Sequence, residues 1–154
     1  AALLERAKLA LAHVDARLYV RDVVTEPVGE ALGQFELVVL FGVLHHVPGA
    51  AQRLDLMRQL ARCVEPGGWL VFSEWRFYED ERLRARILPW DAEMQVEPGD
   101  YLLDWRRGTT ALRYCHDVDD AEHKRLVVAT GLAVAAEFRA DSANLYSVLH
   151  KPLA

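Results

Sequence analysis

The apolar positions of the chain follow two different periods. Apolar residues recur at three- and four-residue spacing in residues 2–14, 50–64 and 120–130, and this spacing predicts three amphipathic helices. Unbroken apolar runs occupy residues 36–43 and 69–74, which is typical of strands buried on both faces of a sheet. The order strand, helix, strand predicts a right-handed βαβ unit whose two strands run parallel.

Shorter patterns lie on either side of this unit. Residues 16–20 have the composition of a short strand, and residues 27–33 that of a weak helix or a loop. Towards the other end, residues 133–139 and 144–150 are two apolar runs separated by a few polar residues, which indicates an antiparallel hairpin. We therefore expect one α/β domain over residues 1–154, with a partial Rossmann-like, mostly parallel sheet that ends in an antiparallel hairpin.

Glycine and proline mark the ends of the predicted helices. Pro66-Gly67-Gly68 is expected to end the second helix, and Gly131 the third. Between these helices, residues 76–118 mix charged residues, tryptophans and turn signals, and only a short helix near residues 79–87 is expected there. A segment of this kind on an α/β scaffold is the usual place for substrate recognition, so we interpret it as an insertion with that role.

Composition narrows the class of protein. The chain has 154 residues, of which 52% are hydrophobic and 27% charged, and this balance argues against disorder. A net charge of −5 gives no general attraction to nucleic acid or to anionic membranes. The longest apolar run, Leu37 to Leu44, is too short to span a bilayer, and no partner membrane is expected.

Two further features bear on the setting of the chain. Cys63 and Cys115 do not lie in a Cys-x-x-Cys or zinc-type pattern, so we expect neither a disulfide framework nor a bound metal. The chain opens directly in a helical pattern, without the features of a signal peptide. A reduced, cytoplasmic location is therefore the expectation. The sequence makes no prediction of the oligomeric state.

Two adjacent histidines, His45 and His46, directly follow the first buried strand. Open α/β sheets bind their ligands beyond the carboxyl ends of the strands, so we expect both histidines at a functional site. The alternative is that they satisfy backbone groups at the end of the strand. His123, on the third helix, is expected to be exposed and without a role.

In this order, the parts resemble the carboxyl-terminal two-thirds of a class I S-adenosylmethionine-dependent methyltransferase. Asp22 stands where that family has the acidic residue that closes its third strand, and FELVV at residues 35–39 matches the family's FDLVV strand, with Glu36 in place of the commoner Asp. The family order continues with Leu44-His45-His46-Val47, then a Leu- and Arg-rich helix, then the Pro-Gly-Gly turn and the terminal hairpin.

The resemblance implies a cofactor and a mechanism. S-adenosylmethionine would be the cofactor, and the residues that match the family's cofactor-binding positions are Asp22, Val23, Phe41, Gly42 and His45. The implied reaction is a direct in-line attack on the methyl group, with His45 and His46 as the catalytic residues that orient the acceptor. Catalysis would then come from positioning and electrostatics.

The insertion carries a narrower likeness. Residues 98–105 and 112–116 resemble two segments of the tRNA wobble-uridine methyltransferases, which esterify a carboxymethyl group on uridine, although Cys115 replaces the second tyrosine of the family's RYYH-like segment. This likeness implies a modified tRNA uridine as acceptor. The residues expected to contact the acceptor are Arg113, Tyr114 and His116, together with Trp75 at the end of the preceding strand. The alternatives are that residues 113–116 form an ordinary strand or loop edge and that Trp75 packs in the core or in a lid. An acceptor carboxylate is already ionised at neutral pH and needs no general base.

The chain also departs from the family. It contains neither the Gly-rich loop after the first strand nor the acidic residue after the second strand, and we expect both to lie upstream of Ala1 in the parent protein. Cofactor affinity of the present chain should then be poor. Because the family's first two strands lie between the third and the fourth, we expect residues 16–20 either to pair with residues 37–43 or to pack loosely.

Two other functions remain open. One is a methyltransferase of the same fold that acts on a small molecule; a basic strip across the insertion would speak against it. The other is a non-catalytic, methyltransferase-like module that binds a partner protein, which would show a blocked crevice or a large exposed apolar edge.

Overall fold

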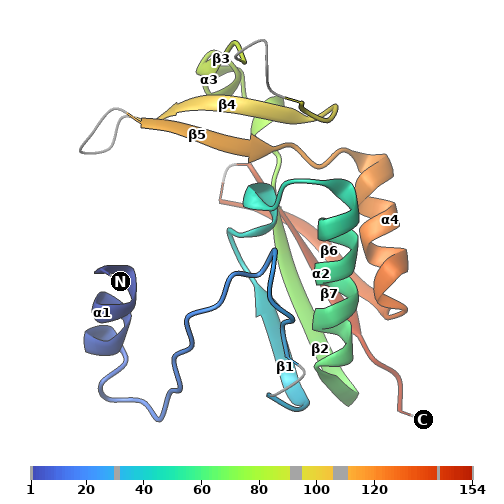
Figure 1. The fold of residues 1–154 in the computed structure, drawn as a ribbon. Coiled ribbons are helices and arrows are strands. Elements are labelled where there is room, and N and C mark those ends of the chain that lie inside the picture. Colours follow the sequence, from blue (N-terminus) through green and yellow to red (C-terminus); the bar gives the residue numbers. More distant parts are fainter. Residues whose placement is uncertain (1, 30–31, 91–94, 106–110, 142, 154) are drawn as a thin grey trace.

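The computed structural model describes residues 2–29, 32–90, 95–105, 111–141 and 143–153, and Figure 1 shows the order of its elements. The helices, strands and short 3-10 turns are, in chain order, α1 (Ala2–Ala10), β1 (Phe35–Leu40), η1 (Leu44–His46), α2 (Ala50–Arg62), β2 (Val64–Trp75), η2 (Phe77–Glu79), α3 (Glu81–Arg84), β3 (Ile87–Leu88), β4 (Asp100–Trp105), β5 (Ala111–His116), α4 (Asp120–Thr130), β6 (Ala133–Ala140) and β7 (Asn144–His150). The described strands form two sheets, β1-β2-β7-β6 and β3-β4-β5.

The four-stranded sheet contains the predicted βαβ unit. α2 connects β1 to β2, and these two strands pair in parallel, with Leu40 opposite Phe72. β2 pairs antiparallel with β7, and β7 antiparallel with β6, so the predicted terminal hairpin is confirmed. The α/β fold is as expected, but the sheet is mixed rather than mostly parallel among the described strands.

The Pro66-Gly67-Gly68 segment differs from its predicted role. α2 ends at Arg62, and these three residues already lie within β2. A Cβ atom on Gly68 would lie 2.9 Å from the carbonyl oxygen of Glu36 in β1. Glycine is therefore needed here because the two strands approach closely at their start, and not because the helix must stop.

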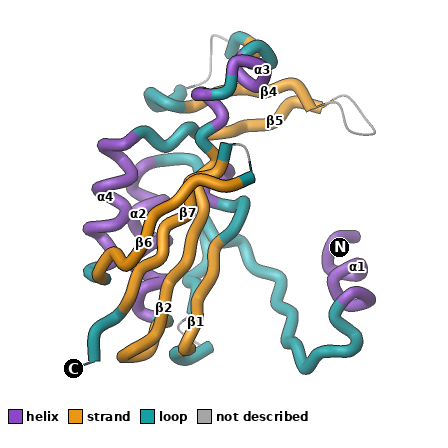
Figure 2. The backbone as a smooth tube through the Cα atoms, turned by 180° about the vertical axis from the view of Figure 1, so that it is seen from behind, coloured by secondary structure: helices purple, strands orange, loops and turns teal. Residues whose placement is uncertain are grey.

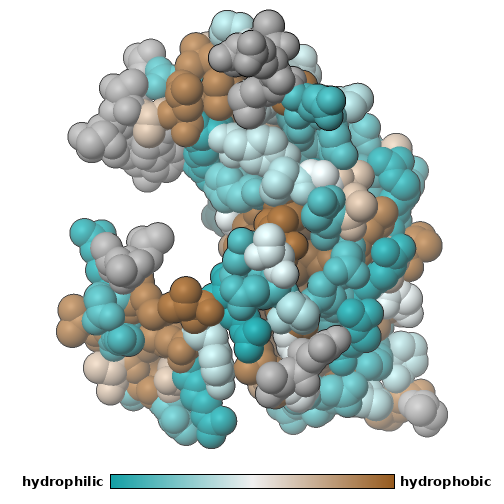
Figure 3. All heavy atoms as spheres, in the orientation of Figure 1, coloured by the Kyte–Doolittle hydropathy of each residue, from teal (hydrophilic) through white to brown (hydrophobic). Residues whose placement is uncertain are grey.

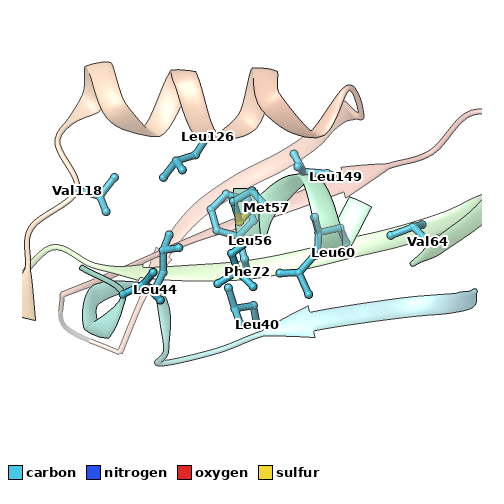
Figure 4. Packing of buried hydrophobic residues seen from close by; sticks show 12 residues of the cluster. Leu40, Leu44, Leu56, Met57, Leu60, Val64, Phe72, Val118, Leu126 and Leu149 are labelled. Atoms are coloured by element: carbon cyan, nitrogen blue, oxygen red, sulfur yellow. The ribbon is translucent and has the colours of Figure 1, made fainter. Parts of the chain in front are cut away.

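One face of the four-stranded sheet carries the core. α2 and α4 both lie on this face (Figures 1 and 2), and buried side chains from both helices meet those of the strands (Figure 4). The cluster is apolar throughout and includes Leu40, Leu56, Met57, Phe72, Leu126 and Leu149. The helical spacing of the apolar residues in α2 explains this arrangement, since it places them along one side of the helix.

The opposite face of the sheet is exposed. Leu37, Val39 and Phe41 alternate with the core-facing residues of β1, and their exposed fractions are 57%, 49% and 51%. On this face Phe138 stacks on Tyr146, and Phe41 contacts Tyr146 edge-on. β1 is also the outer strand of its sheet, with one edge unpaired among the described residues.

The insertion forms a small sheet of its own. β3, β4 and β5 pair antiparallel, and the sheet lies beyond the end of β1 at which η1 begins (Figures 1 and 2). The sequence predicted loops and one helix near residues 79–87; the helix is α3, at residues 81–84, and the strands were missed. β5 contacts η1, so the insertion reaches the predicted site directly.

The N-terminal segment stands apart from the sheets. The predicted helix over residues 2–14 ends earlier, at Ala10, and α1 lies away from the rest of the fold (Figures 1 and 2). The apolar surface of this segment remains uncovered in Figure 3, and Leu9 is 80% exposed. The strand predicted over residues 16–20 is wrong: these residues are irregular and pair with none of the described strands, so they lack the ladder of hydrogen bonds that a strand requires.

Two further features concern the cysteines and the apolar character of the helices. Cys63 and Cys115 are free, buried thiols. Within the described residues, each helix falls short of the length and apolar character that crossing a bilayer requires.

Candidate active site

His45 and His46 occupy a tight turn beyond the carboxyl end of β1. Gly42 adopts a left-handed backbone angle, φ +67°, which turns the chain out of the strand and into η1. The amide of Gly42 donates to the hydroxyl of Ser73 in β2 at 3.2 Å, so the turn is tied to the neighbouring strand. His45 is buried and His46 is exposed. The predicted position at the end of a strand is confirmed.

Arg113 of β5 reaches both imidazole rings. One guanidinium nitrogen, Nη2, lies 2.9 Å from Nε2 of His45 and 2.6 Å from Nε2 of His46. A guanidinium group only donates hydrogen bonds, so both Nε2 atoms accept and each neutral ring carries its proton on Nδ1. Nδ1–H of His46 donates to the carbonyl oxygen of Tyr114 at 3.2 Å. Nδ1–H of His45 is buried and has no acceptor among the described residues.

Both histidines are neutral at physiological pH. Burial, and after it the proximity of His46 and Arg113, lowers the pKa of His45 to about 3. Burial and the charge of Arg113 also lower the pKa of His46, although its bond to the Tyr114 carbonyl works in the other direction. Both imidazole rings that contact the Arg113 guanidinium are therefore uncharged.

Trp75, at the end of β2, forms a wall of this cluster. The guanidinium carbon of Arg113 lies 5.2 Å from the centroid of the Trp75 ring, a cation–π contact. The ring of His45 also lies 5.2 Å from that of Trp75. Four predicted site residues therefore lie together: two from η1, one from β2 and one from β5. We call His45, His46, Trp75 and Arg113 the acceptor cluster.

The side chains of Tyr114 and His116 make their polar contacts outside the acceptor cluster. The hydroxyl of Tyr114 donates to Asp100 at 2.7 Å, and burial together with this bond raises the pKa of the phenol. Both ring nitrogens of His116 lie 2.7 Å from carboxylates, those of Asp100 and Glu122, and the ring is buried. Burial alone would lower the pKa of His116, but the two carboxylates raise it. Both side chains were predicted to contact an acceptor; the structure instead engages their polar atoms in bonds within the protein.

The sequence analysis missed Arg53 and the carboxylates around it. Arg53 is 1% exposed, and its guanidinium donates to Glu122, Glu97 and the carbonyl oxygen of Val47. A signal was present: Arg53 lies four residues before Met57, on the apolar side of its helix. A charged residue at such a position needs buried partners.

His123 also differs from its prediction. The ring is buried rather than exposed, with Nδ1 3.0 Å from Glu74 and Nε2 2.7 Å from Glu137. The bond to Glu74 is the main cause that raises its pKa. Its role is therefore to join α4 to β2 and β6.

Of the predicted cofactor-binding residues, Phe41, Gly42 and His45 directly follow the carboxyl end of β1, whereas Asp22 and Val23 lie in the irregular segment before it. Gly42 has open space where a Cβ would lie, Phe41 is half exposed beside it, and Val23 packs against the core cluster. Asp22 is exposed, and its carboxylate accepts the amide of Val24 at 2.9 Å, which lowers its pKa. An open glycine beside an exposed aromatic ring fits one wall of a site for a nucleoside-containing cofactor.

A metal ion has a possible ligand set here. The donor atoms of His45, His46 and Cys115 lie within 4.8 Å of one another. Burial raises the pKa of the Cys115 thiol to about 11, however, and Arg113 already bonds to both imidazoles. A protonated thiol beside a fixed cation is a poor metal site.

The chain matches a family model described as a methyltransferase domain over residues 5–137. A comparison with curated proteins found no match. The fold is similar to a S-adenosylmethionine-dependent methyltransferase from Clostridium acetobutylicum, with a TM-score of 0.72 and 10% identity, over 98% of this chain and 72% of that one.

Two further similar structures contain a cofactor or its product. The N-methyltransferase NodS from Bradyrhizobium japonicum, in complex with S-adenosyl-L-homocysteine, has a TM-score of 0.57 and 15% identity, over 97% of this chain and 61% of that one. An amino pentose methyltransferase from Micromonospora echinaspora, bound to S-adenosylmethionine, has a TM-score of 0.65 and 18% identity, over 97% and 70%. At these identities the likeness concerns the fold.

Proposed function

The chain belongs to the family described as methyltransferase domains, and from this membership we propose that it transfers a methyl group from S-adenosylmethionine to a small acceptor that carries a carboxylate. The observation that carries the choice of acceptor is the position of Arg113 among two neutral imidazoles and a tryptophan. Arg113 is partly buried, and a partly buried cation attracts an anion more strongly than the same cation in water.

The side chains supply orientation and charge. The cofactor, when bound, supplies an electrophilic methyl group on a positively charged sulfur. Asp22, Val23, Phe41, Gly42 and His45 are the residues proposed to hold it, at the carboxyl end of β1. On the acceptor side, the planar guanidinium of Arg113 would align a carboxylate. The attacking oxygen is already anionic, so no residue needs to remove a proton.

Surface charge favours a small acceptor over a nucleic acid. Of the arginines in the described part of the insertion, Arg82 pairs with Asp80 and Arg84 with Glu81, whereas Arg86 donates to the backbone carbonyl of Asp104 and keeps its charge. A phosphate-binding strip needs cations that are not already neutralised by neighbouring acids. The similar structures from Micromonospora and Bradyrhizobium are an amino pentose methyltransferase and an N-methyltransferase, which is in keeping with a small acceptor for this chain as well.

A modified tRNA uridine is the second candidate. The two segments that resemble the wobble-uridine enzymes pair with each other as β4 and β5, with Asp100 opposite His116 and Leu103 opposite Arg113. The two segments are separate in the sequence, but as paired strands they form a single hairpin-like element. The carboxymethyl group of such a uridine would supply the same carboxylate to Arg113.

The test uses S-adenosylmethionine labelled in its methyl group, at millimolar concentration. Acceptors are offered as matched pairs of a small carboxylic acid and its amide, with amino sugars as a third set. Alkali releases a methyl ester as methanol but leaves an N-methyl group in place. We expect alkali-labile label on acids and none on amides; alkali-stable label on the amino sugars alone would contradict the carboxylate assignment.

The two candidate acceptors are separated with carboxymethyluridine, offered free and within tRNA. Comparable transfer to the free nucleoside supports a small acceptor. Transfer to the tRNA alone supports the second candidate. Binding of S-adenosylhomocysteine is measured in parallel by calorimetry, so that a lack of cofactor binding is distinguished from a lack of catalysis. If the cofactor product binds but no acceptor is methylated, a non-catalytic binding module is favoured, and the exposed residues of β1 would be its interaction surface.

A further inference from the structure

We propose that Arg53 is a positioning residue that sets the acceptor cluster without touching the acceptor, an inference that rests on the function proposed above. Its guanidinium lies inside the fold, where α2, α4 and the insertion meet. It donates from Nε to Glu122 at 2.7 Å, from Nη1 to the carbonyl oxygen of Val47 at 3.0 Å and from Nη2 to Glu97 at 3.0 Å.

The bond to Val47 holds η1, the short turn that carries His45 and His46. Val47 directly follows η1, and its own amide donates to Leu44 to close that turn at 3.1 Å. Arg53 therefore holds the residue next to His46 through a charge-assisted bond from the neighbouring helix. The direction in which the two imidazoles point depends on this anchor.

The bond to Glu122 leads to β5, the strand that carries Arg113. Glu122 Oε2 lies 2.7 Å from Nε2 of His116, and Nδ1 of His116 lies 2.7 Å from Asp100. Asp100 also accepts from the hydroxyl of Tyr114 at 2.7 Å. Arg113 precedes Tyr114 in β5. We name Arg53, Glu122, His116, Asp100 and Tyr114 the Arg53 network, and it links α2 and α4 to the strand that carries Arg113.

The network thus sets both partners of the acceptor cluster at once. One arm fixes the turn with His45 and His46, and the other fixes β5 with Arg113. The three side chains meet within 2.6–2.9 Å, and contacts of that length are sensitive to shifts of a fraction of an ångström. A misplacement of about 1 Å can cost about 100-fold in rate.

A purely structural role is the alternative. Buried ion pairs often contribute little to stability, since desolvation offsets their attraction, and apolar replacements of similar volume can be tolerated. A stability measurement therefore cannot separate the two roles. A readout at the acceptor cluster is required.

The experiment compares Arg53→Met with Arg58→Met. Both arginines lie on α2, but Arg58 is exposed, so the control removes the same charge from the same helix without touching the network. The imidazole resonances of His45 and His46 are followed by NMR as the pH changes. In Arg53→Met we expect the pKa of His46 to rise towards its ordinary value, because a displaced ring is less buried and lies further from Arg113.

The same variants are then assayed for methyl transfer. We expect the acceptor KM to rise at least tenfold in Arg53→Met, with little change in the KM for the cofactor, and Arg53→Lys to restore part of the loss. The NMR result does not depend on catalysis, so it can stand if the proposed function fails. Unchanged imidazole titrations in a folded Arg53→Met protein would overturn the inference.

Should Arg53→Met fail to fold, Glu122→Gln decides the matter. This variant keeps the volume of the side chain but removes the charge that joins Arg53 to His116. We expect altered resonances for His45 and His46, which Glu122 does not contact. If these resonances match those of the unmodified protein while His116 alone changes, the network does not position the cluster.

Discussion

Nη2 of Arg113 lies 2.6 Å from Nε2 of His46, although 67 residues separate the two positions in the sequence. The contact joins the insertion to the end of the first strand of the main sheet. It also fixes the protonation of His46, because a guanidinium next to Nε2 allows a proton only on Nδ1. The candidate site therefore combines side chains from two parts of the fold, and its arginine comes from the insertion.

Replacing Arg113 with alanine should impair use of the acceptor much more than binding of the cofactor. Loss of a hydrogen bond to a charged group costs about 1.5–3 kcal/mol, which corresponds to a rise of about 10- to 100-fold in the acceptor KM. Steady-state kinetics with each substrate varied in turn measure the two effects separately. Arg113→Lys is the control, since it keeps the charge but not the planar fork. Equal losses for acceptor and cofactor would remove Arg113 from the acceptor side.

The sequence predicted the unit from β1 to β2 and the terminal hairpin because their patterns are long and regular. It missed β4 and β5, where Asp100, Asp104 and Arg113 interrupt the apolar residues and the strands are stabilised mainly by pairing with each other. The error at residues 16–20 has the opposite cause: a strand-like composition found no partner.

The sequence indicated the residues of the acceptor cluster but not the buried residues behind it. The histidines follow a clear strand end, and the resemblance to a family indicated Trp75 and Arg113. Arg53 was missed, because its partner Glu122 lies 69 residues away and no local pattern connects them. Long-range polar contacts of this kind depend on how the helices pack, which local periodicity does not determine.

His45 should destabilise the fold in acid. Its pKa is about 3 in the folded chain, far below the ordinary value of 6.5, so between these values the unfolded chain takes up a proton that the folded chain does not. The free energy of unfolding contributed by His45 is therefore fully present above pH 6.5 and falls as the pH decreases towards 3. Urea unfolding at a series of pH values from 7 to 4.5 measures the slope, which should be shallower in His45→Gln. An identical slope in the variant would show that other groups cause the acid sensitivity.

His123 should act in the opposite direction. Its bonds to Glu74 and Glu137 raise its pKa above 6.5, so the folded chain holds a proton that the unfolded chain has lost. Its stabilising contribution is complete below pH 6.5 and decreases as the pH rises through the raised pKa. Glu137→Gln removes the more exposed of the two carboxylates, and we expect a smaller loss of stability between pH 6.5 and 8.5 in this variant. Asp55→Asn, an exposed acidic residue on α2, is a matched control and should leave that loss unchanged.

Gly131 ends α4 in a left-handed conformation, φ +68°, and a Cβ at this position would meet no other atom within 4 Å. Substitution therefore tests the backbone alone, without a steric clash. We expect Gly131→Ala to lower the free energy of unfolding by about 1 kcal/mol. In the left-handed region a Cβ atom lies too close to the following carbonyl oxygen, which destabilises the backbone by about that amount. Gly131→Asn should lose less, since asparagine tolerates that region better than alanine. Chemical denaturation of the three proteins measures the difference, and equal stability of Gly131→Ala and the parent would mean that α4 ends differently in solution.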